Sequence, residues 1–242
     1  MASERAMQEL LRAGTAIDED RVRQALAAGL DKDLRMREGA TLLHAASMSD
    51  SAGIARALIE AGANADAMSD AGASPLHVCC KYDSVRVALV LLQAGANIHP
   101  QMVHAGGPLH VAARFGSVRV ARLLLEAGAP VDAPLDLDLG VPFLIAGATP
   151  LHCCAGSAFG AAVAGLLLAA RADTNAQDDL GGTPLHVSSR TGHVGVATIL
   201  LEAGADSNVR DDDGKTPLER CSAAHGVAEL LLLEGLHQVS MG

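Results

Sequence analysis

Large aromatic side chains are nearly missing from this sequence. Half of its 242 residues are hydrophobic, yet it has no tryptophan, and its only aromatic residues are Tyr82, Phe115, Phe143 and Phe159. Alanine, leucine and valine must therefore fill the interior. A core of such small side chains indicates helices that stack closely on one another.

Positive charge is also scarce. The chain has 18 lysines and arginines against 28 aspartates and glutamates, which gives a formal net charge of −10. Surfaces that bind nucleic acids usually carry excess positive charge, because phosphate contacts supply most of their affinity. We therefore expect no nucleic-acid partner.

Long apolar runs are absent as well. The longest apolar stretch covers residues 160–170, which is far below the roughly 20 residues that cross a bilayer. The first residues include Glu4 and Arg5 and no apolar run of the signal-peptide kind. We expect no membrane contact and a location in the cytoplasm, with the nucleus as an alternative.

No recognisable catalytic motif occurs. The sequence has no nucleophile elbow, phosphate loop, paired Cys-His signature or H-E-x-x-H. Its five cysteines lack C-x-x-C spacing. Four of them form two adjacent pairs, Cys79-Cys80 and Cys153-Cys154, and adjacent side chains point about 100° apart on a helix. We expect buried thiols, no metal, no cofactor and no enzymatic activity.

The chain instead repeats one short motif. Its copies begin at Thr41, Ser74, Gly107, Thr149, Thr183 and Thr216, at steps of 33, 33, 42, 34 and 33 residues, and five of them contain Leu-His. A hydroxyl residue followed by proline is typical of a helix start. Leucine-rich runs that end at Gly62, Gly95, Gly128, Arg171 and Gly204 predict a second helix in each unit, and about twelve residues then lead to the next motif.

This helix-turn-helix-hairpin order with Thr-Pro-Leu-His resembles the ankyrin repeat over roughly residues 18 to 236. The resemblance implies an all-α ankyrin-repeat solenoid with β-hairpin-like fingers, forming one domain over 1–242. We divide it into an N-terminal cap (1–35), five repeats and a C-terminal cap (211–242), in which Gly235 is expected to end the last helix. The repeats are 36–68, 69–101, 102–143 with an insertion, 144–177 and 178–210.

The resemblance also implies a function: recognition of another protein by a chain that is monomeric when free. In similar repeats the last turn of each first helix lies on a concave face where partners bind. The residues in that register are Met48, Lys81, Tyr82, Arg114, Phe115 and Arg190. The alternatives for this column are an ordinary solvated surface for the cations and packing beneath a neighbouring helix for the rings.

The third hairpin is nine residues longer than the others. In residues 131–139 apolar side chains alternate with Asp132, Asp136 and Asp138, which predicts a strand-like finger. We expect a partner contact at Leu135, Asp136, Leu137, Asp138 and Leu139. The alternatives are a tolerated surface insertion, or a finger that locks the chain into a larger assembly as a structural or regulatory subunit.

Three further expectations concern single positions. Arg171 should adopt a left-handed conformation that usually favours glycine. The in-register histidines stand one to a repeat, so they cannot converge on one ion, and the resemblance implies that they bond the backbone between units. Asn175 and Asn208 occupy the turn position that asparagine hydroxylases modify in similar repeats, which the sequence alone does not settle.

Overall fold

A computed structural model describes residues 19–99, 106–136, 145–221 and 225–241. Its regular structure is helical, and no β-strand occurs in these ranges. After α2 (Glu19–Ala27), helices follow in pairs. The pairs are α3 (Leu42–Met48) with α4 (Ala52–Glu60), α5 (Pro75–Tyr82) with α6 (Val85–Gln93), α7 (Pro108–Phe115) with α8 (Val118–Glu126), α9 (Pro150–Ala155) with α10 (Ala161–Ala169), and α11 (Pro184–Thr191) with α12 (Val194–Glu202).

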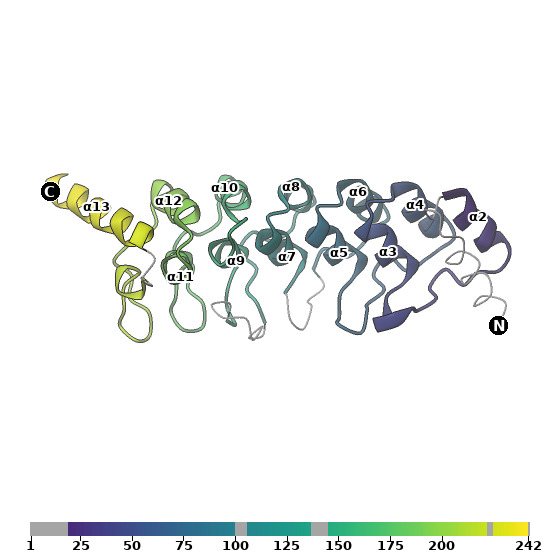
Figure 1. Ribbon diagram of the computed structural model, residues 1–242, viewed down its shortest axis with the longest axis horizontal. Coiled ribbons are helices and arrows are strands. Elements are labelled where there is room, and N and C mark those ends of the chain that lie inside the picture. The colour runs from purple at the N-terminus through teal and green to yellow at the C-terminus, as the bar shows by residue number, and fades with distance from the viewer. Residues whose placement is uncertain (1–18, 100–105, 137–144, 222–224, 242) are drawn as a thin grey trace.

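The pairs stack side by side into one elongated array (Figure 1). The first helices of the pairs form one row, the second helices form another, and the hairpins hang from one side. Each first helix packs against the first helix of the next pair, and the second helices do the same. This is the helical solenoid that the repeated motif predicts.

The interior consists of small aliphatic side chains, as expected. The motif leucines Leu76, Leu151 and Leu185 are fully buried, and so are Leu58 and Leu91 from second helices. None of the described aromatic side chains belongs to this core. Tyr82, Phe115 and Phe159 are 48%, 41% and 74% exposed, so the few rings of the chain lie on its surface.

All five cysteines are free thiols, and four of them are buried. Burial raises the pKa of Cys79 and of Cys153 to about 12. These thiols therefore stay protonated at neutral pH and serve as small apolar core residues.

Four of the five motif histidines tie neighbouring units together. At His152, Nδ1 accepts a hydrogen bond from the backbone N–H of Thr149 at 3.0 Å, so Nε2 carries the proton and donates to the carbonyl of Gly182 in the next unit at 3.0 Å. His44, His77 and His186 make the equivalent pair of bonds. Burial lowers the pKa of His152 to about 4, which keeps the ring neutral.

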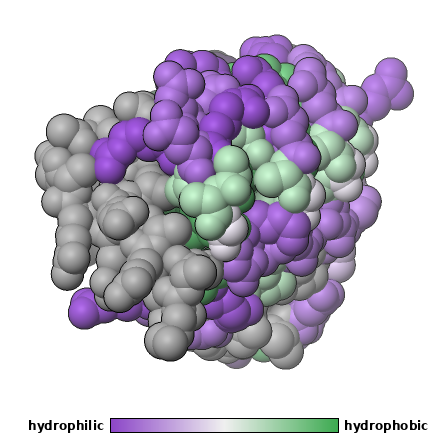
Figure 2. All heavy atoms as spheres, turned by 90° about the vertical axis from the view of Figure 1, so that its right-hand side faces the viewer, coloured by the Kyte–Doolittle hydropathy of each residue, from purple (hydrophilic) through white to green (hydrophobic). Residues whose placement is uncertain are grey.

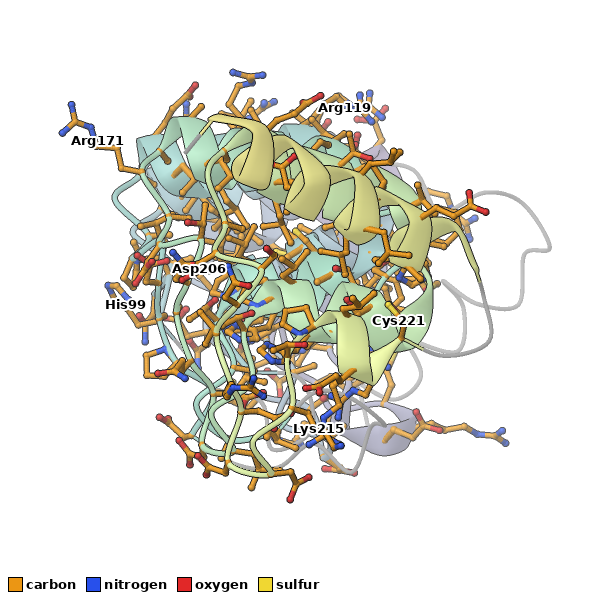
Figure 3. The ribbon with its side chains drawn as sticks, turned by 90° about the vertical axis from the view of Figure 1, so that its left-hand side faces the viewer. His99, Arg119, Arg171, Asp206, Lys215 and Cys221 are labelled. Atoms are coloured by element: carbon orange, nitrogen blue, oxygen red, sulfur yellow. The ribbon has the colours of Figure 1, made fainter. Side chains whose placement is uncertain are left out.

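A second column of side chains joins the units where each hairpin begins. Oδ1 of Asp66 accepts from the backbone N–H of Asn97, and Oδ1 of Asn175 accepts from that of Asp206, each at 2.8 Å. At the junction that follows Asp66 and Asn97, His99 and Pro130 occupy the same register, and proline has no N–H to donate. Figure 3 shows His99 and Asp206 on the same side of the array.

Turns at the ends of the first helices provide a third tie. Asp83 follows α5 in a left-handed conformation, with φ 52°. Its Oδ1 accepts from the N–H of Val120 at 3.0 Å, and its Oδ2 accepts from Nε of Arg119 at 2.9 Å. Asp50 binds Val87 and Arg86 in the same way one unit earlier.

The C-terminal end departs from the expectation. The sixth motif forms only a short 3-10 helix, η2 (Leu218–Arg220), where Glu219 replaces histidine and its Oε2 accepts from the N–H of Thr216 at 2.8 Å. The last helix, α13 (His225–Met241), runs through Gly235 rather than ending there. The prediction was wrong because glycine inside a helix costs only about 1 kcal/mol, and no atom outside the local chain crowds Gly235.

Candidate functional site: a groove along the first helices

The last turns of three successive first helices surround an open hollow. Met48, Tyr82 and Phe115 end α3, α5 and α7, and Met48 is 55% exposed. The hollow measures about 560 Å³ and is also lined by Lys81 and Arg114. Tyr82 and Phe115 are 33 residues apart and occupy the same position on parallel helices, whereas Met48 occupies the position of Lys81 and Arg114, one residue earlier. We call this hollow the α3–α7 groove.

Small side chains make the floor of the groove. Ala45, Val78 and Val111 stand one helical turn before Met48, Tyr82 and Phe115, and His44 and His77 lie beside them. The imidazoles already bond to their own units and to the next carbonyls, so they are fixed parts of the floor. Toward the hairpins the groove is bordered by other residues, which include Met36, Glu38 and Ser69.

The two cations of the groove lie next to its aromatic rings. Nζ of Lys81 is 5.5 Å from the centre of the Tyr82 ring and 5.8 Å from that of Phe115, while Cζ of Arg114 is 5.9 Å from the Phe115 ring. Within the described ranges neither cation forms an ion pair. The attraction between a cation and an aromatic ring is weak, about 0.5–1 kcal/mol at exposed sites, so both charges remain available to a partner.

Arg190 does not join this groove. It lies two units further along, in a hollow of about 120 Å³ that also contains Asp178, Asp211 and Arg220. Burial lowers the pKa of Arg190, and the nearby Asp178 opposes that effect. Arg190 is thus separated from the other predicted binding residues, and it lies instead beside carboxylates of the hairpins.

The fourth unit brings an aromatic residue that the register argument missed. Its column position holds Gly156 and Ser157, but α9 ends two residues earlier than α5 or α7, and five residues rather than two separate it from α10. Phe159 projects from this loop with 74% of its surface exposed. Oγ of Ser157 donates to the carbonyl of Arg114 at 2.6 Å, which fixes the loop against the end of α7. The extra residue between Gly156 and Gly160 was the only sequence signal.

The inserted finger is described only at its base. The N–H of Leu135 donates to the carbonyl of Ala148, and the N–H of Gly147 donates to that of Leu135, both at 2.9 Å. The bond between Ser69 and Ala73 closes the ordinary second hairpin in the same way, so the nine extra residues fall in the sequence between Leu135 and Ala148.

The two finger residues within the described ranges differ in exposure. Leu135 is 2% exposed and packs beside Gly106, so the prediction that it contacts a partner was wrong: alternation does not say which face is buried. Asp136 is exposed. Leu137, Asp138 and Leu139 lie outside the described residues.

The acidic residues at the hairpin tips accept hydrogen bonds from backbone N–H groups of their own turns and form ion pairs with a neighbouring arginine. Oδ1 of Asp178 accepts from the N–H of Gly182 at 2.8 Å, and Oδ1 of Asp211 accepts from that of Lys215 at 3.0 Å. Arg220 pairs with Asp211 and Asp213. No group of three or more potential metal ligands was found in the described part of the chain.

The surface views add two observations. The N-terminal end is mostly hydrophilic, with a small apolar patch near the middle of the view (Figure 2). Seen from the C-terminal side, Arg171, which follows α10, points into solvent (Figure 3). Its φ of 68° confirms the predicted left-handed conformation. Among the described helices none is long and apolar enough to cross a membrane.

Comparisons with known proteins agree with this geometry. A family model described as "Ankyrin repeats (3 copies)" matches residues 10–102 and 158–240, and one described as "Ankyrin repeat" matches residues 107–134. The crystal structure of the human ASB11 ankyrin repeat domain is 27% identical, with a TM-score of 0.76 over 95% of this chain and 94% of that chain. The ankyrin repeat domain of Bcl-3, "a unique member of the IkappaB protein family", is 25% identical, with a TM-score of 0.71 over 93% and 96%. No curated protein sequence matches.

Proposed function

Since the chain belongs to the ankyrin repeat family, whose members are generally protein-interaction modules, we propose that it is a non-enzymatic recognition domain that binds a partner protein through the α3–α7 groove. Its work would be to hold a binding surface in a fixed shape. The stacked units pay the ordering entropy when the chain folds, so little further entropy is lost on binding.

The observation that carries this proposal is the exposure of large apolar side chains around an open hollow. A chain that buries leucine throughout its core leaves Met48, Tyr82 and Phe115 half in solvent, on one side, at the ends of three successive first helices. Isolated apolar side chains on a surface are common, but a contiguous group marks an interaction site. Aromatic residues in particular contribute much of the free energy at protein interfaces.

Affinity capture with matched variants tests this function. The wild-type chain is compared with a double variant, Tyr82→Ala and Phe115→Ala, and with a control, Leu89→Ala and Val194→Ala, which removes apolar side chains of about 40% exposure from second helices. Thermal melting first establishes that all three are folded. We expect one specific protein to be captured by the wild type and the control and lost by the groove variant. Equal capture by the groove variant would contradict the proposal.

The inserted finger supports a second candidate, a regulatory or structural subunit held in an assembly by residues 131–145. Its motivation is the length of the finger, which has nine residues more than the other hairpins between the bonded residues Leu135 and Ala148. Deletion of residues 137–145 tests it without removing the buried Leu135 side chain. If the deletion abolishes capture that the groove variant preserves, the finger is the recognition element and the groove is not.

A further inference from the structure

Exposed aromatic residues are found beyond the groove as well, in the next unit along the array. Tyr82, Phe115 and Phe159 come from three successive units and stand at the same end of each helix pair, where the first helix turns into the second. We call them the aromatic stripe. They are three of the four aromatic residues in the whole chain, so aromatic side chains are concentrated on this surface rather than used for packing.

The stripe is held rigidly at the junction between its last two members. Gly116 follows Phe115 with φ 70°, and a Cβ added there would lie 2.6 Å from the carbonyl oxygen of Phe159 and 2.7 Å from its Cβ. The loop of Phe159 therefore packs directly on the backbone that ends α7. The N–H of Phe159 donates to Oγ of Ser157 at 3.2 Å, and that hydroxyl donates to the carbonyl of Arg114.

Positive charge accompanies the stripe in an acidic protein. Lys81 and Arg114 immediately precede Tyr82 and Phe115 and make no ion pair in the described ranges, whereas on the second helices Arg86 and Arg119 are paired with aspartates. The nearest carboxylates of the same turns, Asp50 and Asp83, are the partners in those pairs. Glu38 lies at the far end of the groove, next to the first hairpin.

This combination selects for a kind of partner. Aromatic rings and a shallow apolar floor fit aliphatic or aromatic side chains, and two unneutralised cations attract carboxylates. Single-stranded nucleic acid also stacks on rings, but it needs a basic groove that follows its backbone, and a chain of net charge −10 offers two cations here. Charge complementarity favours an acidic protein segment.

Resting on the proposed function, we infer that the groove receives an acidic segment of the partner protein that carries apolar side chains, and that this segment continues along the aromatic stripe to Phe159. Its apolar side chains contact Met48, Tyr82, Phe115 and Phe159. Its carboxylates contact Lys81 and Arg114.

Peptide selection tests the chemistry of this segment. A phage-displayed library of random peptides without tyrosine or tryptophan is selected against the full chain, and enriched peptides are synthesised. Tyr82 is the only tyrosine and tryptophan is absent, so tyrosine emission reports binding at the stripe directly. We expect enrichment of aspartate and glutamate together with apolar residues. Enrichment of basic or neutral peptides, failure to enrich any peptide, or an equal change of Tyr82 emission with oligo(dT), would overturn the inference.

Variants in matched pairs test the contacts. Arg114→Glu should lower the affinity for the selected peptides at least about tenfold. The control Arg122→Glu makes the same charge change at an exposed position on α8, and it should change the affinity less than about twofold. Phe159→Ala should weaken binding about tenfold and Leu180→Ala, also exposed, should not. An unchanged affinity of the Phe159→Ala variant would contradict the claim that the bound segment continues to the fourth unit.

The two proposals fail in distinguishable ways. If capture of a protein depends on Tyr82 and Phe115 but the selected peptides are not acidic, the proposed function holds and this inference is wrong. If capture is independent of the groove, the proposed function itself is wrong.

Discussion

The ammonium nitrogen of Lys81 lies 5.8 Å from the centre of the Phe115 ring, across the junction between two units. The last turns of α5 and α7 therefore build one surface rather than two separate helix ends. Such a contact exists only when neighbouring units stack in register. The ties that maintain this register, and the surface they create, lead to the following predictions.

Asp83 should be one of the residues that stabilise the junction most. Asp83→Ala removes the acceptor of the Val120 N–H and places alanine at φ 52°, so we expect a loss of about 1–3 kcal/mol in the free energy of unfolding. Asp83→Asn keeps an oxygen acceptor and a residue that tolerates the left-handed conformation, and it should lose less than half as much. Urea unfolding measures both, and equal losses would contradict this role of Asp83.

Below neutral pH the buried histidines should destabilise the fold. The pKa of His152 falls from 6.5 to about 4 on burial, so between these values the unfolded chain binds a proton that the folded chain does not. The contribution of the neutral His152 ring to the free energy of unfolding is fully present above pH 6.5. It declines by about 1.4 kcal/mol for each pH unit as the pH falls from there toward 4. Urea unfolding from pH 7 to pH 4 should therefore show a steeper decline for the wild type than for His152→Gln. Parallel pH dependences would show that His152 does not titrate in this way.

Arg171→Gly should stabilise the array. Arg171 has φ 68° where Gly62, Gly95, Gly128 and Gly204 occur in the other units, and a side chain there costs about 1 kcal/mol. Thermal melting should show a higher Tm. The reciprocal change Gly204→Arg, at a position with φ 84° and no crowding atom within 4 Å, should lower Tm by a similar amount. A lower Tm for Arg171→Gly would mean that the arginine makes a compensating contact.

The missing tie at the third junction should be restorable. His99→Asp with Pro130→Asn recreates the pair that Asp66 and Asn97 form at 2.8 Å. We expect the double variant to be about 1 kcal/mol more stable than the sum of the single changes predicts, because only together do they supply acceptor and donor. Loss of proline offsets part of the absolute gain. A double-mutant cycle of unfolding free energies measures the coupling, and a coupling near zero would contradict the expected bond.

The sequence predicts the array because its information is periodic. The motif starts at Ser74, Gly107 and Thr183 define helix starts, and the 33-residue step from Ser74 to Gly107 places Tyr82 and Phe115 on neighbouring helix ends. A register argument works for these residues because every unit has the same geometry. For this reason the sequence could predict that five residues lie around one hollow, namely Met48, Lys81, Tyr82, Arg114 and Phe115.

Where a unit departs from the repeat, the same argument fails. Arg190 has the right register, but carboxylates from two hairpins surround it, and sequence spacing does not give the path of a hairpin. One extra residue moves Phe159 out of register, and the loop that carries it packs against Gly116 of the preceding unit. The two-residue alternation in the finger did not reveal that Leu135 faces the core, because alternation fixes a period and not a side.

Site-specific photocrosslinking tests the central claim most directly. Benzoylphenylalanine replaces Tyr82 in the groove in one sample, and Leu89, which is 40% exposed on the second helix of the same unit, in another. Both proteins are irradiated in a lysate that contains the captured partner. Recognition through the α3–α7 groove predicts a crosslinked partner from position 82 and none from position 89. Crosslinks from position 89 alone, or from neither position while capture persists, would contradict it.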